Sequence, residues 1–192
     1  TVMDSPATAF GAHNRKMAMW VFIASECMFF GSLIATYLSY EGKSLVGPTP
    51  HEILNIPLTS VSTFVLLMSS LAMVLALDAV QSGNRRMARV WLLGVIVLGG
   101  LFLGGQVFEF SHFYREGLTL KQNLFGATFF VLTGFHGAHV TVGVIWMFTL
   151  LVMSLRGRLG PDRGLDVEVA GLYWHFVDVV WIVIFTVDYL IQ

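Results

Sequence analysis

Residues 124–155 read LFGATFFVLTGFHGAHVTVGVIWMFTLLVMSL and contain no aspartate, glutamate, lysine or arginine. A helix that crosses the roughly 30 Å hydrocarbon core of a bilayer needs about 20 mostly apolar residues, so this stretch is long enough to cross it and to tilt. Membrane barrels use strands of about ten residues with alternating polarity, a pattern that the sequence does not contain. The stretch therefore predicts a membrane-spanning helix.

The rest of the chain has the same character. Of its 192 residues, 56% are hydrophobic and 12% are charged, whereas about a quarter of the residues of a soluble domain are charged. Short polar loops separate the apolar blocks. We therefore predict an all-α integral membrane protein in which residues 17–192 form a bundle of five transmembrane helices. The predicted spans are about 17–39, 58–77, 90–108, 124–155 and 169–191.

Lysine and arginine are distributed unequally between the two sides of this predicted bundle. Eight of the 11 lie in residues 1–16 and in the second and fourth loops, and the other three lie in the first and third loops. Basic residues are retained on the cytoplasmic side of a membrane. We therefore predict a cytoplasmic N-terminal segment, residues 1–16, and a periplasmic or extracellular C-terminus. The segment has no apolar core, so it does not read as a signal peptide.

Composition also excludes several kinds of partner and site. The net charge of −1 shows no basic excess of the kind that binds nucleic acid, so we expect no nucleic-acid partner. The single cysteine, Cys27, excludes an intrachain disulfide and a paired thiolate metal site. Its neighbours are apolar apart from Glu26, so we expect Cys27 to be a small buried hydrophobe.

Acidic and imidazole side chains inside the predicted spans are the candidate functional residues. A carboxylate at mid-bilayer costs at least about 2.5–3.5 kcal/mol, so it faces other helices or water and usually has a role. Glu26 lies in the first span, while His136/His139 and His175/Asp178 lie in the last two. Each of these pairs is spaced i, i+3, which places both members on one helix face. We expect all five side chains to point into the bundle.

Three interpretations of these polar residues remain open. They ligate a metal or heme, they form a path for protons or ions, or they join helices by hydrogen bonds and hold lipid headgroups or a partner subunit. A transporter is expected to show broken helices or an inverted repeat at its site, and neither is visible. Bis-histidine heme binding needs paired histidines at equal depth on facing helices. The pattern favours the structural interpretation, with no metal bound by this chain.

Glycine positions indicate where helices approach closely. Gly100 and Gly104 form a small-xxx-small pair in the third span and are flanked by Gly99 and Gly105. Helices in lipid associate through faces of this kind. We predict that the Gly100–Gly104 face packs against another helix. The fourth span offers Gly134, Gly137, Ala138 and Gly143 in the same way.

Three stretches resemble one known family. Residues 128–140, TFFVLTGFHGAHV, are similar to a span signature of cytochrome c oxidase subunit III. Residues 173–181, YWHFVDVVW, resemble that family's closing signature, with its preceding glutamate at Glu168. Residues 20–30, WVFIASECMFF, are similar to the segment that carries the family's buried, carbodiimide-reactive glutamate. The resemblance covers all five predicted spans, roughly residues 16–191.

The resemblance implies a non-catalytic subunit of a proton-translocating heme–copper oxygen reductase in a prokaryotic plasma membrane. Such a subunit packs beside the catalytic subunit I, with subunits II and IV as further partners, and binds no heme or copper itself. It holds phospholipids in a cleft, supports proton uptake on the cytoplasmic side and protects the oxidase from inactivation during turnover. Longer members have two additional N-terminal spans that form one wall of the cleft, so either another subunit supplies that wall or the cleft is open here.

Carried over residue by residue, the resemblance gives Glu26 the role of the buried carboxylate. It assigns no catalytic and no metal-binding residue to this chain. Arg156 falls where a basic residue meets a lipid phosphate at the cytoplasmic edge. The lipid-binding or structural polar cluster that the resemblance implies comprises His136, His139, Arg156, Glu168, His175 and Asp178.

Two other functions fit part of the pattern. One is the homologous accessory subunit of a nitric oxide reductase, which has a similar sequence pattern. The other is a free-standing ion transporter that uses Glu26 and Asp178. Copurification with a copper-carrying subunit, together with oxygen consumption by that complex, distinguishes an oxidase subunit from a nitric oxide reductase subunit. Proton flux in liposomes that contain this chain alone tests the second.

Overall fold

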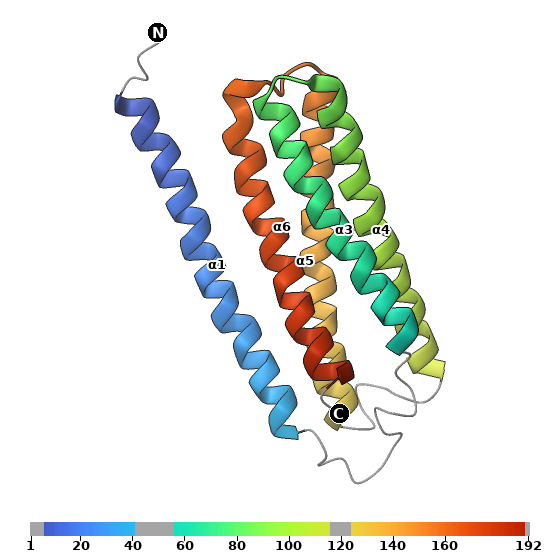
Figure 1. Cartoon of the computed structure of the whole chain (residues 1–192). Coiled ribbons are helices and arrows are strands. Elements are labelled where there is room, and N and C mark those ends of the chain that lie inside the picture. Colours follow the sequence, from blue (N-terminus) through green and yellow to red (C-terminus); the bar gives the residue numbers. More distant parts are fainter. Residues whose placement is uncertain (1–5, 41–55, 116–123, 191–192) are drawn as a thin grey trace.

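The computed structural model describes residues 6–40, 56–115 and 124–190 (Figure 1). No strand occurs among these residues, and the long elements are all helices. A 3-10 helix precedes the last long helix, and a π-helical turn continues it. The elements are α1 (Pro6–Tyr40), α3 (Ile56–Gln81), α4 (Arg85–Arg115), α5 (Leu124–Leu155), the 3-10 helix (Pro161–Arg163), α6 (Gly164–Phe185) and the π-helical turn (Thr186–Leu190).

All five long helices are long and apolar enough to cross a membrane. Their apolar stretches are Asn14–Tyr40, Thr59–Gln81, Arg85–Ser111, Gly126–Leu155 and Pro161–Asp188. The all-α, five-span prediction is therefore confirmed, and the chain is a multi-pass membrane protein.

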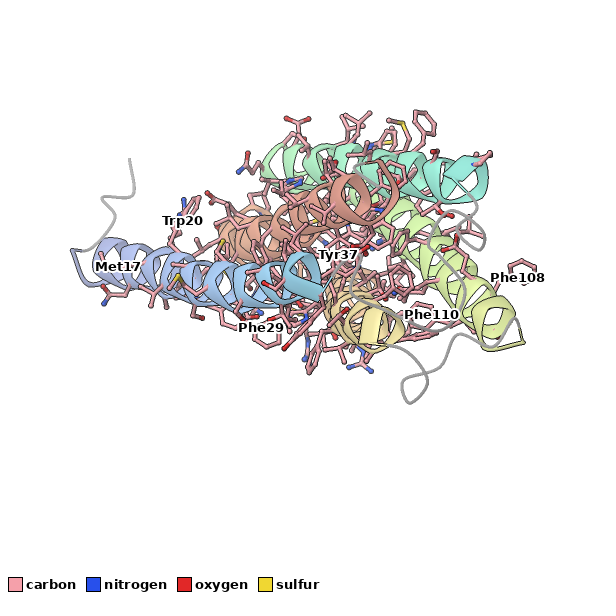
Figure 2. The ribbon with its side chains drawn as sticks, turned by 90° about the horizontal axis from the view of Figure 1, so that it is seen from below. Met17, Trp20, Phe29, Tyr37, Phe108 and Phe110 are labelled. Carbon is pink, nitrogen blue, oxygen red and sulfur yellow. The ribbon has the colours of Figure 1, made fainter. Side chains whose placement is uncertain are left out.

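Helix α6 lies at the centre of the bundle. It packs against α1, α3 and α5, while α4 packs against α3 and α5 (Figure 1). Within the chain, 61% of an apolar window of 18 residues in α6 is buried, compared with 11% of the corresponding window in α1. Seen from below, Tyr37 of α1 lies against the bundle, whereas Phe108 of α4 projects away from it (Figure 2). Many other large apolar side chains are also exposed, as is typical of helices that lie in lipid.

One end of the bundle collects basic residues. The N-terminus of α1, the turn between α3 and α4, and the connection between α5 and α6 lie at the upper end of Figure 1. Gly83 and Gly157, with φ of 75° and 70°, turn the chain there, and glycine adopts this conformation without steric cost. We call this end of the bundle the basic end. It carries Arg15, Lys16, Arg85, Arg86, Arg89, Arg156, Arg158 and Arg163.

Trp174 of α6 joins three neighbouring helices. Its ring packs so closely on Gly99 of α4 and Gly143 of α5 that an added Cβ would lie 2.8 and 2.6 Å from ring atoms. Its indole Nε1 donates a hydrogen bond of 3.0 Å to the Ser69 hydroxyl of α3. Since lipid is as apolar as the side chains, close packing and hydrogen bonds of this kind hold membrane helices together.

The predicted glycine face of α4 is wrong by one residue. A side chain at Gly100 or Gly104 would meet nothing within 4 Å, so these glycines face away from the rest of the chain. Their neighbours Gly99 and Gly105 make the close approaches instead. Adjacent residues of a helix are about 100° apart, so a register change of one residue moves a packing face to the lipid side.

Candidate functional site

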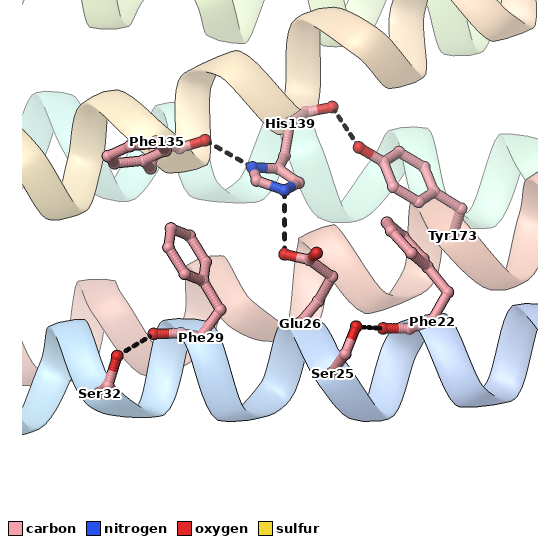
Figure 3. A network of polar contacts seen from close by, with 8 residues as sticks. All are labelled: Phe22, Ser25, Glu26, Phe29, Ser32, Phe135, His139 and Tyr173. Atoms are coloured by element: carbon pink, nitrogen blue, oxygen red, sulfur yellow. Dashed lines mark hydrogen bonds and ion pairs between the residues drawn. The ribbon is translucent and has the colours of Figure 1, made fainter.

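Glu26 of α1 and His139 of α5 point toward one another between their helices (Figure 3). Oε2 of Glu26 lies 3.2 Å from Nε2 of His139, and each side chain is 19% exposed. Glu26 is near the middle of the apolar stretch Asn14–Tyr40. The next residue, Cys27, is exposed, so the expectation that it is buried within the chain is wrong.

The two contacts of the His139 ring limit where the protons of this pair can lie. Its Nδ1 lies 2.7 Å from the backbone carbonyl of Phe135. A carbonyl only accepts, so Nδ1 carries a proton. A favourable contact between Nε2 and the Glu26 oxygen needs one further proton, on either the imidazole or the carboxyl. Both arrangements have no net charge, which lowers the cost of placing two titratable groups inside a membrane.

Aromatic side chains enclose the Glu26–His139 pair. The Tyr173 hydroxyl of α6 donates to the backbone carbonyl of His139 at 3.0 Å. The ring of Phe30 meets the imidazole edge-on, with centroids 5.0 Å apart. Phe29 meets Phe135 in the same way at 5.2 Å. Apolar surroundings of this kind strengthen the acid–imidazole hydrogen bond electrostatically.

His136 is fully buried and contacts α4 and α6 instead of α1. Its Nε2 donates to the Val177 carbonyl of α6 at 3.2 Å. Its ring packs against Phe102 and Trp181, with centroids 5.8 and 4.8 Å away. Residues spaced i, i+3 are about 60° apart around a helix, so His136 and His139 reach different neighbours.

His175 and Asp178 of α6 face α3. Nδ1 of His175 lies 2.5 Å from the hydroxyl oxygen of Ser70. The Ser70 hydroxyl also lies beside the Asp178 carboxyl. Its short hydrogen bond is the one to His175. In the part of the chain that the structure describes, neither carboxyl oxygen of Asp178 has a hydrogen-bond partner within hydrogen-bonding distance. Asp178 is 3% exposed. The in-span candidates therefore form three separate contacts rather than one cluster.

Glu168 takes part in a pair of ionic contacts at the basic end. Its Oε1 lies 2.7 Å from Nζ of Lys16. Beside it, Nη2 of Arg15 lies 2.6 Å from Oδ1 of Asp166. Both contacts join α1 to α6. Arg156 follows α5 at the same end and is exposed.

Sequence reasoning missed a buried carboxylate on α4. The third predicted span, about 90–108, stops one residue before Glu109, yet Glu109 lies inside α4 and is 7% exposed. The Thr59 hydroxyl of α3 donates to it. One turn earlier, Gln106 Nε2 donates to the Thr133 carbonyl of α5 at 2.7 Å. The i, i+3 spacing of Gln106 and Glu109 on an otherwise apolar helix was the available signal.

These contacts define a class of protein. It is a multi-pass helical membrane protein whose spans are joined by acid–imidazole, hydroxyl–carboxylate and amide–carbonyl contacts. Among the described residues, no group of three or more histidine, cysteine, aspartate or glutamate side chains is placed to hold a metal ion.

Comparison with known proteins gives the family. A model of cytochrome c oxidase subunit III matches residues 4–191. The chain is 36% identical to cytochrome c oxidase subunit 3 of Bacillus sp. (strain PS3), over 92% of the chain and 86% of the relative. It is 37% identical to cytochrome c oxidase subunit 3 of Bacillus subtilis (strain 168), with the same coverage of both proteins. It is 36% identical to a probable quinol oxidase subunit 3 of Staphylococcus saprophyticus, over 92% of the chain and 88% of the relative.

The chain belongs to the cytochrome c oxidase subunit III family, which confirms the family predicted from the sequence motifs. Its role is that of subunit III of a heme–copper oxidase, as a member of a terminal oxidase complex.

Proposed function

We propose that this chain supports proton uptake by a respiratory oxygen reductase in a prokaryotic plasma membrane, with its basic end in the cytoplasm. In this proposal the chain packs beside subunit I and binds phospholipid. The heme and copper are held by the partner subunits. The excess of basic residues at one end supports this orientation. The observation that carries the proposal is the Glu26–His139 contact, because it places an acid beside an imidazole where α1, α5 and α6 meet. Ionisable groups inside membranes commonly serve proton relays.

Glu26→Gln in the assembled oxidase tests this role. The amide cannot carry the exchangeable proton, so we expect slower proton uptake, measured with a pH dye in proteoliposomes. Oxygen consumption and pumping are expected to persist, since the chemistry lies in subunit I. Asp162→Asn is the control, because it neutralises an exposed carboxylate at the basic end. Complete loss of pumping in a normally assembled complex, or uptake as fast as in the control, would contradict the proposal.

Relatives of this chain include subunits of cytochrome c oxidases and of a quinol oxidase, so the proposal extends to either electron donor. Mild-detergent purification through this chain tests the partner assignment. We expect a copper-carrying subunit I, subunits II and IV, and oxygen consumption with one of the two donors. Nitric oxide reduction by a complex without copper would instead assign the chain to a nitric oxide reductase.

A further inference from the structure

Helix α1 is held unevenly along its length. Figure 1 shows its N-terminal half diverging from α6 toward the basic end. Beyond Glu26, away from the basic end, Phe30 packs on Phe176 of α6 and on His139, with centroids 6.4 and 5.0 Å apart. On the basic side of Glu26, Phe22 contacts Tyr173 of α6 with ring centroids 6.2 Å apart.

Two ion pairs close the diverging half of this junction. Arg15 meets Asp166 at 2.6 Å and Lys16 meets Glu168 at 2.7 Å. Lys16 lies about 15 Å along the helix from Glu26 at a rise of about 1.5 Å per residue. The basic side chains are 57% and 42% exposed. Ion pairs as exposed as these are weak and are screened by salt.

Asp166 has a second cationic neighbour. Nη1 of Arg163 lies 4.0 Å from the other Asp166 oxygen, within the α6 end of the chain. Asp166 therefore keeps a positive partner when Arg15 leaves, which lowers the cost of separating α1 from α6 at this end.

We propose that the Arg15–Asp166 and Lys16–Glu168 ion pairs form a latch that controls how readily water enters between α1 and α6 and reaches the Glu26–His139 pair. This inference builds on the proposed function, in which that pair exchanges a proton with the basic side. With the latch closed, as in this structure, the two ion pairs limit how far the N-terminal half of α1 stands away from α6. With the latch open, few buried contacts hold that half, so the junction widens and water reaches Glu26.

Labelling of Glu26 by a water-soluble carbodiimide tests the latch in the purified oxidase complex in lipid nanodiscs. The reagent modifies carboxyl groups that it reaches from water, and mass spectrometry gives the rate at Glu26. Lys16→Glu replaces an attraction by a repulsion. We expect the labelling rate to rise by about 1.5- to 5-fold, the factor set by the loss of one exposed ion pair. Lys16→Glu combined with Glu168→Lys restores the pair and should return the rate to that of the unaltered complex.

Arg158→Glu is the matched control. It makes the same change of charge at the basic end, on an exposed side chain, and should leave the rate unchanged. A rate in Lys16→Glu equal to that of the unaltered complex, or an equal rise in Arg158→Glu, would overturn the latch. Failure of the combined variant to restore the rate in an intact complex would do the same.

A second measurement needs no variant. In the unaltered complex, raising the salt concentration screens both ion pairs, so labelling by the water-soluble reagent should accelerate. Labelling by a lipid-soluble carbodiimide, which arrives from the membrane, should not follow the salt concentration. A salt-independent water-soluble reaction would overturn the latch. These rates do not depend on turnover, so their failure is distinct from a failure of the Glu26→Gln test of proton uptake.

Discussion

The two ring nitrogens of His139 have different tasks: one fixes the orientation of the ring, and the other contacts a second helix. The hydrogen bond from Nδ1 to the Phe135 carbonyl sets the ring within its own helix. Nε2 is then directed at Glu26 of another helix. The backbone contact of Nδ1 therefore leaves Nε2 free to face an acid on a different helix.

At this scale, a double-mutant cycle with Glu26→Gln and His139→Phe measures the contact. We expect a coupling free energy of about 0.6 kcal/mol and at most about 1.7 kcal/mol, the range found for hydrogen bonds between membrane helices. Unfolding by increasing fractions of denaturing detergent gives the four stabilities. Glu26→Gln combined with Asp162→Asn should be additive, because these residues share no contact. A cycle for Glu26 and His139 that is also additive would show that the pair does not join the helices.

At the scale of helices, glycine decides which faces meet. Gly143 of α5 and Gly99 of α4 admit the Trp174 ring between their helices, whereas Gly134 of α5 has nothing within 4 Å of an added Cβ. On α5, one glycine therefore allows close packing against another helix, while another glycine lies on a face without close neighbours. The difference comes from which way each position faces, and composition does not reveal it.

Gly143→Ala and Gly134→Ala form a matched pair on α5. The methyl group at Gly143 would lie 2.6 Å from the Trp174 ring, and overpacking of this kind costs about 1–3 kcal/mol. At Gly134 we expect no loss, because the methyl group enters open space. Thermal stability in detergent compares the two variants. Equal stabilities would contradict the close packing of Trp174 between α4 and α5.

At the scale of the whole molecule, the chain offers a peripheral span, α1, joined to a bundle centred on α6. The Glu26–His139 pair lies at that junction, and the buried Glu109 and Asp178 lie elsewhere in the bundle. This arrangement fits a subunit that modulates proton access for a neighbour and leaves electron transfer to that neighbour.

This arrangement predicts the effect of removing the entire chain from the oxidase complex. We expect initial oxygen reduction to persist, because subunit I carries the chemistry, and the number of turnovers before inactivation to fall. An oxygen electrode trace at saturating donor gives both quantities. Adding the chain back should restore the working life of the enzyme. A complex that loses all initial activity on removal of the chain, yet keeps its heme and copper, would assign the chain a catalytic part.

The number of spans, the gathering of basic residues at one end and the family could be read from the printed residues. Apolar length and short motifs are local properties, and residues 124–155 alone establish a membrane-spanning helix. Glu26, His139 and His175 could be selected as candidates because polar groups are costly in lipid. Glu109 stands at the edge of an apolar block, so the cost of burial did not single it out, and its spacing from Gln106 was the one signal left in the sequence.

Packing between helices settled which side chains meet. His136 and His139 are close in sequence, yet one contacts Val177 and the other contacts Glu26. A rotation of about 100° per residue directs neighbouring positions to different helices, and only the arrangement of all the spans decides which helix each position faces. The local sequence therefore identifies the polar residues whose burial in lipid costs free energy, and the packing of the helices determines which groups they contact.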